Sequence, residues 1–181
     1  FDEVGWFYPS SSSTEIDRYV VYNYAENVWS YGLLERHAWL DSGVEPIPRA
    51  TRDNYLYDHE TGYNDDGSPM TDVYIESSDF DIGDGEQFAF ITKMIPDVRF
   101  LNNSSDGSVN LVLKTRNFPG DSLNTSSTSA VTSSTQQTYI RARARQAVLR
   151  VESNDDSTEG NDDTGWRLGA TRMEVRPDGR R

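Results

Sequence analysis

Cysteine is absent from the 181-residue sequence. Its absence excludes a disulfide framework, a thiolate metal site and a cysteine nucleophile. No run of about 18 apolar residues occurs either, so we expect no membrane-spanning segment. A Gly-x-Ser-x-Gly elbow, a His-Glu-x-x-His motif and a glycine-rich phosphate loop are also missing. We therefore expect a protein that is not an enzyme.

Basic residues are scarce. The sequence holds 17 Lys and Arg against 30 Asp and Glu, a formal net charge of −13 at pH 7, and only Lys93 and Lys114 are lysines. A protein that grips DNA needs a basic face, and the overall balance argues against one while leaving room for local basic patches. The length fits one domain or two small ones.

Alternation of apolar and polar residues with period two is the main structural signal, and helical periodicity is nearly absent. Segment 136–151 is long enough for a helix, but Tyr139–Arg145 alternates and therefore indicates a strand. We predict an all-β fold of antiparallel sheets, with partial propeller-like blades followed by a β-sandwich-like domain. The candidate strands, rich in Val, Ile, Tyr, Phe and Trp, are 1–9, 18–24, 28–34, 73–80, 87–100, 109–115, 139–145, 147–152 and 166–175.

A soft domain boundary is predicted near residue 70. Residues 1–70 hold three of the four tryptophans, whereas residues 71–181 have longer strands and more polar connections. Segments 102–107, 122–135 and 154–164 are too polar to contribute to a core, so we predict them to be solvated loops or mobile hairpin tips. The sequence begins in what looks like the middle of a strand, and we expect a longer parent chain.

Tyr22 and Trp29 flank the turn 25–27 in a predicted hairpin. Their spacing resembles the second half of a kelch-like propeller blade, in which Tyr and Trp pack between neighbouring sheets. An ordinary aromatic hairpin is the alternative. A complete propeller needs about four blades of ~50 residues, so residues 1–70 are expected to complete a propeller that is built in a longer chain.

The acidic residues Asp79, Asp81, Asp84 and Glu86 cluster in segment 78–86. Alternating carboxylates beside glycine are typical of calcium loops, although Gly83 stands where an EF-hand places its third ligand. A carboxylate pair of a glycoside hydrolase is a second hypothesis, and sequence alone gives no separation between the two groups. The plainer alternative is a strand that leaves its sheet, with carboxylates in water or paired with arginines. Calcium is the only cofactor that the sequence suggests.

Arg141, Arg143 and Arg145 recur at every second position, which places three guanidinium groups on one strand face. They suit phosphate or an acidic neighbour, and the alternative is pairing with acidic residues of adjacent strands or stacking on aromatic rings. In so acidic a chain the pairing is favoured, and we regard the three as subunit-interface candidates. His37 is predicted to be packed or superficial, and His59 to be solvated in a turn.

Several separated strings resemble the C-terminal part of structural proteins from short-tailed, podovirus-type bacteriophages, namely tail hub or nozzle proteins related in role to the packaged-DNA stabilisation proteins. The strings are 17–24 (DRYVVYNY), 28–32 (VWSYG), 75–85 (IESSDFDIGDG), 94–97 (MIPD), 116–120 (RNFPG), 166–170 (WRLGA) and 176–181 (RPDGRR).

The resemblance implies a virion tail protein: a homo-hexameric tube below the portal and its adaptor ring that retains packaged DNA and then conducts it outward. The resemblance assigns no catalytic residue to this sequence. An acidic passage would repel phosphate and so avoid tight DNA binding. The alternatives are a β-sandwich carbohydrate- or receptor-binding module, with Tyr55, Tyr57 and Tyr63 as sugar-stacking residues, and a glycoside hydrolase fragment.

Overall fold

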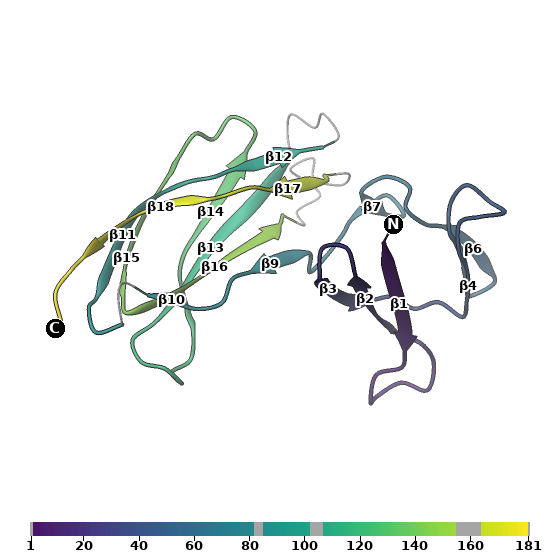
Figure 1. Ribbon diagram of the computed structural model, residues 1–181. Coiled ribbons are helices and arrows are strands. Elements are labelled where there is room, and N and C mark those ends of the chain that lie inside the picture. Colours follow the sequence, from purple (N-terminus) through teal and green to yellow (C-terminus); the bar gives the residue numbers. More distant parts are fainter. Residues whose placement is uncertain (1, 82–84, 102–106, 155–163, 181) are drawn as a thin grey trace. The chain divides into compact units, whose positions relative to one another are not determined.

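The computed structural model describes residues 2–81, 85–101, 107–154 and 164–180. Every regular element in these ranges is a β-strand, and every strand pair is antiparallel (Figure 1), which confirms the predicted all-β class. Within the same ranges, no helix reaches the length and hydropathy needed to cross a bilayer.

The chain divides into two compact units, Phe1–Thr61 and Gly62–Arg181. The sequence places the boundary near residue 70, and the structure places it at residue 61. Each unit has its own sheets and its own packing, and each is described by itself.

The N-terminal unit contains two three-stranded antiparallel sheets. In the first, β1 (Glu3–Tyr8), β2 (Arg18–Asn23) and β3 (Val28–Leu33) follow one another as a meander. In the second, β4 (Ala38–Leu40), β5 (Arg49–Arg52) and β6 (Tyr55–Asp58) do the same. The tight turns use residues that tolerate positive φ, with Asn27 at 57° between β2 and β3 and Asp53 and Asn54 at 50° and 66° between β5 and β6.

An aromatic contact joins the two sheets of this unit. The ring centroids of Phe7 on β1 and Trp39 on β4 lie 5.1 Å apart. Tyr19 on β2 lies across Gly32 on β3, where a Cβ atom would come within 2.7 Å of the tyrosine ring. A four-stranded propeller blade would need one more strand than the β1–β3 meander has, and no closed propeller exists among the described residues.

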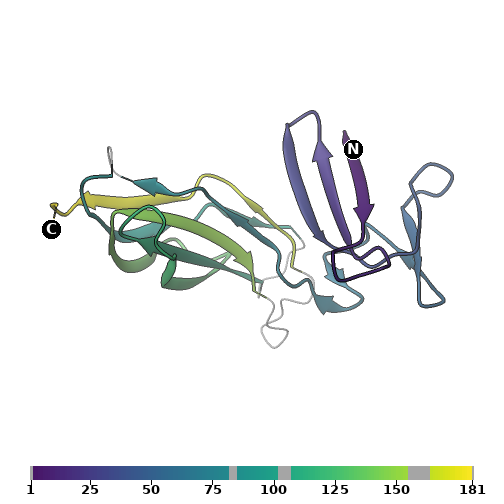
Figure 2. The same cartoon turned by 90° about the horizontal axis from the view of Figure 1, so that it is seen from below.

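The C-terminal unit is a sandwich of two sheets (Figures 1 and 2). The larger sheet has the order β10-β16-β13-β14, and β9 also pairs with β16; the smaller has the order β15-β11-β18. Two short pairs, β7–β8 and β12–β17, complete the unit. The strands are β7 (Asn64–Asp65), β8 (Ser68–Pro69), β9 (Tyr74–Glu76), β10 (Phe80–Asp81), β11 (Ala89–Ile95), β12 (Val98–Phe100), β13 (Ser108–Arg116), β14 (Asn124–Thr132), β15 (Thr138–Ala144), β16 (Gln146–Ser153), β17 (Trp166–Leu168) and β18 (Arg172–Pro177).

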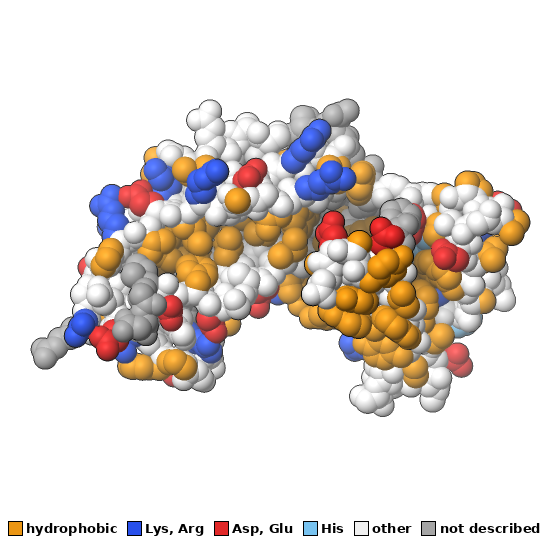
Figure 3. Space-filling model, viewed as in Figure 1, with side chains coloured by type: hydrophobic (Ala, Val, Ile, Leu, Met, Phe, Trp, Pro, Cys, Tyr) orange, Lys and Arg blue, Asp and Glu red, His pale blue; other side chains and the backbone are white. Residues whose placement is uncertain are grey.

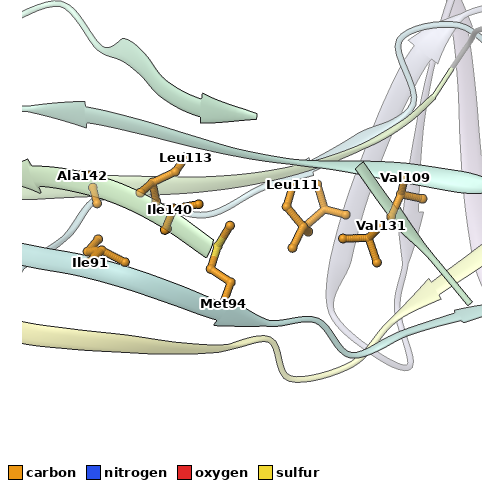
Figure 4. Close-up of a cluster of buried hydrophobic side chains, with 10 residues drawn as sticks. Ile91, Met94, Val109, Leu111, Leu113, Val131, Ile140 and Ala142 are labelled. Atoms are coloured by element: carbon orange, nitrogen blue, oxygen red, sulfur yellow. The ribbon is translucent and has the colours of Figure 1, made fainter. Parts of the chain in front are cut away.

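Apolar side chains from both sheets meet between them to form the core (Figure 4). Ile91 and Met94 come from β11, whereas Leu111 and Leu113 come from the central strand β13, and all four are at most 2% exposed. Strand β15 alternates strictly between buried and exposed positions. This alternation directs Ile140 and its odd-numbered exposed neighbours to opposite sides of the sheet.

The predicted loop 122–135 is wrong, because most of it forms β14. Its hydroxyl-rich residues pair with β13 along the strand, and Val131 is 1% exposed in the core. Three predicted strands are each divided in two: 73–80 into β9 and β10, 87–100 into β11 and β12, and 166–175 into β17 and β18. Residues 102–106 and 155–163, in the other two predicted loops, lie outside the described residues.

Candidate interaction surfaces

The β1–β3 sheet has one face made almost entirely of apolar and aromatic residues. Residues that oppose each other in an antiparallel sheet share a face. The register places Tyr22 opposite both Val4 and Trp29, and Val20 opposite both Trp6 and Tyr31. We define the aromatic face as Val4, Trp6, Tyr8, Val20, Tyr22, Trp29, Tyr31 and Leu33.

This aromatic face is open among the described residues. Trp29 is 59% exposed, Tyr31 72% and Leu33 67%. In Figure 3 a dense group of hydrophobic side chains covers the same part of the N-terminal unit. Exposed apolar patches of this kind on small proteins mark interaction surfaces.

Stacked rings organise the aromatic face. The ring centroids of Tyr22 and Trp29 lie 4.5 Å apart at an interplanar angle of 25°, and those of Trp6 and Trp29 lie 5.9 Å apart at 22°. The structure therefore brings Tyr22 and Trp29 together across β2 and β3. Part of the surface of these rings is used for mutual contact, and the rest remains available to a partner.

One end of the aromatic face is acidic. The hydroxyl of Tyr24 donates to Oδ1 of Asp2 at 3.2 Å, and this hydrogen bond raises the pKa of Tyr24 above its usual 10.0. Glu26 lies in the adjoining turn, where its backbone N–H donates to Oδ1 of Asn23. Within the described ranges, neither Asp2 nor Glu26 forms an ion pair with an arginine or lysine. These carboxylates are available to cations from outside.

The outward face of β15-β11-β18 is cationic. Phe90 on β11 opposes Arg143 on β15 and Arg176 on β18, and in the next row Lys93 opposes Tyr139 and Glu174. Arg141 is exposed on β15, and Arg172 pairs opposite Ile95. We define the arginine face as Phe90, Lys93, Ile95, Tyr139, Arg141, Arg143, Arg172, Glu174 and Arg176.

Cations outnumber carboxylates on the arginine face. Glu174 contacts Nε of Arg176 at 3.0 Å and Nζ of Lys93 at 3.7 Å. The hydrogen bond and charge of Arg176, with a smaller contribution from Lys93, lower the pKa of Glu174 below its usual 4.5. Arg141 and Arg172 make no ion pair with any described residue. The face therefore has unpaired positive charge in a chain whose net charge is −13.

Arg143 is anchored from two sides. Its Nε donates to the carboxylate of Asp178, and its Nη2 donates to the backbone oxygen of Asp178 at 3.2 Å. Its guanidinium carbon also lies 4.0 Å from the ring centroid of Phe88. Arg143 therefore follows the alternative interpretation of the three arginines, in which they pair with acidic residues and stack on aromatic rings.

Of the three arginines expected on one strand face, Arg141 and Arg143 lie on β15, whereas Arg145 follows its last residue. Arg145 is the single residue between β15 and β16, where the chain passes from the smaller sheet to the larger one. Its guanidinium lies 5.0 Å from the ring centroids of both Phe88 and Phe118, and its Nη2 donates to the backbone oxygen of Arg180. These contacts of Arg145 thus stabilise the connection between the two sheets of the sandwich.

The residues of the predicted calcium loop do not converge in the described part of the chain. Asp79 pairs with Arg116, and Glu86 pairs with Arg180 at 3.1 Å. Asp84 lies outside the described residues. Among those described, no three acidic or histidine side chains are grouped closely enough to hold a metal ion. Asp79 and Glu86 are thus paired with arginines, as the plainer alternative for this segment expects.

The prediction of a solvated His59 is wrong. The ring of His59 is half-buried with its centroid 4.7 Å from that of Trp39, and Nε of Arg36 donates to its Nε2 at 3.0 Å. His37 is exposed at the start of β4. His59 therefore packs against neighbouring side chains, whereas His37 lies on the surface.

Two of the three tyrosines considered for sugar stacking, Tyr55 and Tyr57, do not form one flat platform. Tyr55 and Tyr57 are neighbours on β6, but their rings are inclined by 60°. The guanidinium of Arg36 covers Tyr57 at 4.3 Å. Tyr63 belongs to the other unit and lies against Gly165, where a Cβ atom would come within 2.4 Å of its ring.

Sequence reasoning missed most of both faces. Large apolar residues occur at every second position in Val4, Trp6 and Tyr8. This alternation is the signal that would have extended the aromatic face beyond Tyr22 and Trp29. Lys93 and Arg172 have no comparable local signal, because only strand pairing brings them onto the same face of the sheet as Arg143. No family model and no curated protein sequence matches this chain.

Proposed function

We propose that this chain is a structural protein of a short-tailed bacteriophage virion, part of an oligomeric tail hub or nozzle that retains packaged DNA and then lets it pass. The observation that carries the proposal is the open aromatic face. A chain with so large an exposed apolar surface is suited to permanent assembly, since obligate interfaces bury apolar area.

The charge balance supports the conduit part of the proposal. Tight DNA binding depends on the release of counterions by many Lys and Arg contacts. At a net charge of −13 the chain as a whole repels phosphate. A tube built from such chains would hold DNA by confinement and release it without breaking many ion pairs.

The resemblance to tail hub and nozzle proteins drawn from the sequence suggests the family context, and six copies is the number that it implies. The two open faces lie on different units of the chain, which suits a ring-forming subunit.

The direct test is assembly of the purified chain. Light scattering coupled to size-exclusion chromatography and negative-stain images should reveal rings, and the portal or adaptor protein of the same virion should co-purify with them. A chain that stays monomeric at high concentration and with the portal protein present would overturn the proposal.

A further inference from the structure

We propose that the aromatic face of one copy of this chain is covered by the arginine face of a second copy. The inference rests on the proposed homo-oligomeric function, and it names the two surfaces through which neighbouring copies meet.

The aromatic face requires a partner layer. A three-stranded sheet gains most of its stability by packing an apolar face against another layer. The opposite side of the β1–β3 sheet already contacts the second sheet of its unit through Phe7 and Trp39. The exposed Trp29 and Tyr31 are residues of the kinds enriched at the energetic centres of protein interfaces.

The arginine face has the chemistry to fill this role. Guanidinium groups stack on the faces of Trp and Tyr rings and keep their charge while doing so. The chain already uses this contact in both units, with Arg150 at 3.7 Å from the ring centroid of Tyr74 and Arg36 at 4.3 Å from that of Tyr57. Tyr139, which is 74% exposed, adds apolar area among the arginines.

Charge selects this pairing over contacts between identical faces. The N-terminal unit holds 11 Asp and Glu against 4 Arg, and Asp2 and Glu26, at the end of its aromatic face, form no ion pair with any residue that the structure describes. Two arginine faces repel one another, and so do two N-terminal units. Only the contact between unlike faces brings opposite charges together, and like-charge contacts suppress the alternatives.

One cation lies within the aromatic sheet itself. Arg18 opposes Tyr8 and Leu33 in the end row, which is the row away from Asp2 and Tyr24. Its sequence neighbour Asp17 accepts hydrogen bonds from Ser10, and these, together with the nearby charge of Arg18, lower the pKa of Asp17. The local carboxylate offsets Arg18, so the acidic end remains the docking point for arginines.

A contact between two different faces is heterologous. Each copy then offers one unused face until the last copy meets the first, so the result is a closed ring or a continuous filament. This is the geometry that a tubular assembly needs.

Charge reversal on the two faces tests the inference. The first variant combines Arg141→Glu with Arg172→Glu, two side chains that make no ion pair with described residues. The second combines Asp2→Lys with Glu26→Lys. The matched control for the first variant is Arg99→Glu with Arg167→Glu, an opposed and exposed pair on β12 and β17 that changes the net charge by the same amount as the first variant. Size-exclusion chromatography with light scattering measures assembly, and circular dichroism checks folding.

We expect each interface variant to assemble about tenfold more weakly or worse than the wild type. The first variant leaves the arginine face with as many carboxylates as cations, and the second places lysines against arginines. A mixture of the two variants should assemble again, because the acidic end of the first variant meets the unchanged arginine face of the second, and the new lysines of the second meet the new carboxylates of the first. The control should assemble like the wild type, and added salt should weaken the wild-type assembly.

Wild-type assembly that survives the Arg141→Glu and Arg172→Glu changes, or a mixture that stays monomeric, would overturn the pairing and leave the proposed function standing. A wild-type chain that does not assemble at all would overturn both. A Tyr31→Ser variant separates the two kinds of contact: it should weaken assembly without changing its salt dependence, and unchanged assembly would count against the aromatic face.

Discussion

The guanidinium of Arg143 lies 4.0 Å above the ring of Phe88, and its Nε also donates to the carboxylate of Asp178. The arginine thereby joins β15 to residues that flank β11 and β18, across the whole width of the smaller sheet. Its orientation is fixed within the chain, and the neighbouring Arg141 extends from the same face without an ion pair to a described residue.

The Arg143–Phe88 contact is expected to stabilise the fold by about 0.5–1 kcal/mol beyond the burial of the ring. A double-mutant cycle with Arg143→Met and Phe88→Leu isolates this term, since both replacements keep apolar volume. Urea unfolding of the four proteins gives the coupling free energy. A coupling of zero within error would show that the ring only fills space.

Replacement of Gly169 by alanine is expected to destabilise the C-terminal unit by about 0.5–1.5 kcal/mol, because the exposed Asp97 side chain has to turn away and give up its hydrogen bond. The new Cβ atom would come within 2.3 Å of Oδ2 of Asp97, and that oxygen accepts a hydrogen bond from the backbone N–H of Ala170 at 3.0 Å. Gly43→Ala is the control, because nothing lies within 4 Å of a Cβ atom there. Equal midpoints of thermal unfolding for both variants would contradict the prediction.

The stability contribution of Glu174 is expected to depend on pH. Its folded-state pKa is lowered from 4.5, chiefly by Arg176. A lowered pKa means that the ionised group stabilises the folded state above pH 4.5 and that this stabilisation is lost as the pH falls through the folded-state value. The difference in free energy of unfolding between wild type and Glu174→Gln should therefore be largest near neutral pH and vanish in strong acid.

Glu15→Gln serves as the comparison for the loss of one carboxylate, because Glu15 is exposed, lies on neither of the two faces and forms no ion pair with a described residue. A Glu174→Gln difference that is flat with pH would mean that the Arg176 contact does not form in solution.

The purified chain is expected to leave duplex DNA unshifted in a gel at physiological salt. The net charge of −13 repels phosphate, and the proposed assembly would cover the local cations of the arginine face. The Asp2→Lys and Glu26→Lys variant, which exposes the arginine face and is less acidic, should bind DNA more strongly at low salt. Tight binding by the wild type would count against a conduit that releases its cargo.

Local alternation in the sequence was sufficient to predict an all-β fold, because side chains of a strand point to opposite sides at every second residue. It also identified the β2–β3 hairpin and its opposed Tyr22 and Trp29. The strand 124–132 escaped prediction because its Ser and Thr residues carry little hydrophobic signal. Its place is decided by backbone pairing with β13 and by the burial of Val131.

The sequence by itself determined the class of the fold, the acidic charge and the alternation that separates Arg141 and Arg143 from the core. Only the tertiary structure decided that Lys93, Arg172 and Arg176 join them on one face and that Arg145 leaves the series at a corner. The physical reason is that alternation fixes which side of a strand a residue occupies, whereas the choice of neighbouring strand depends on how distant segments pack a shared core.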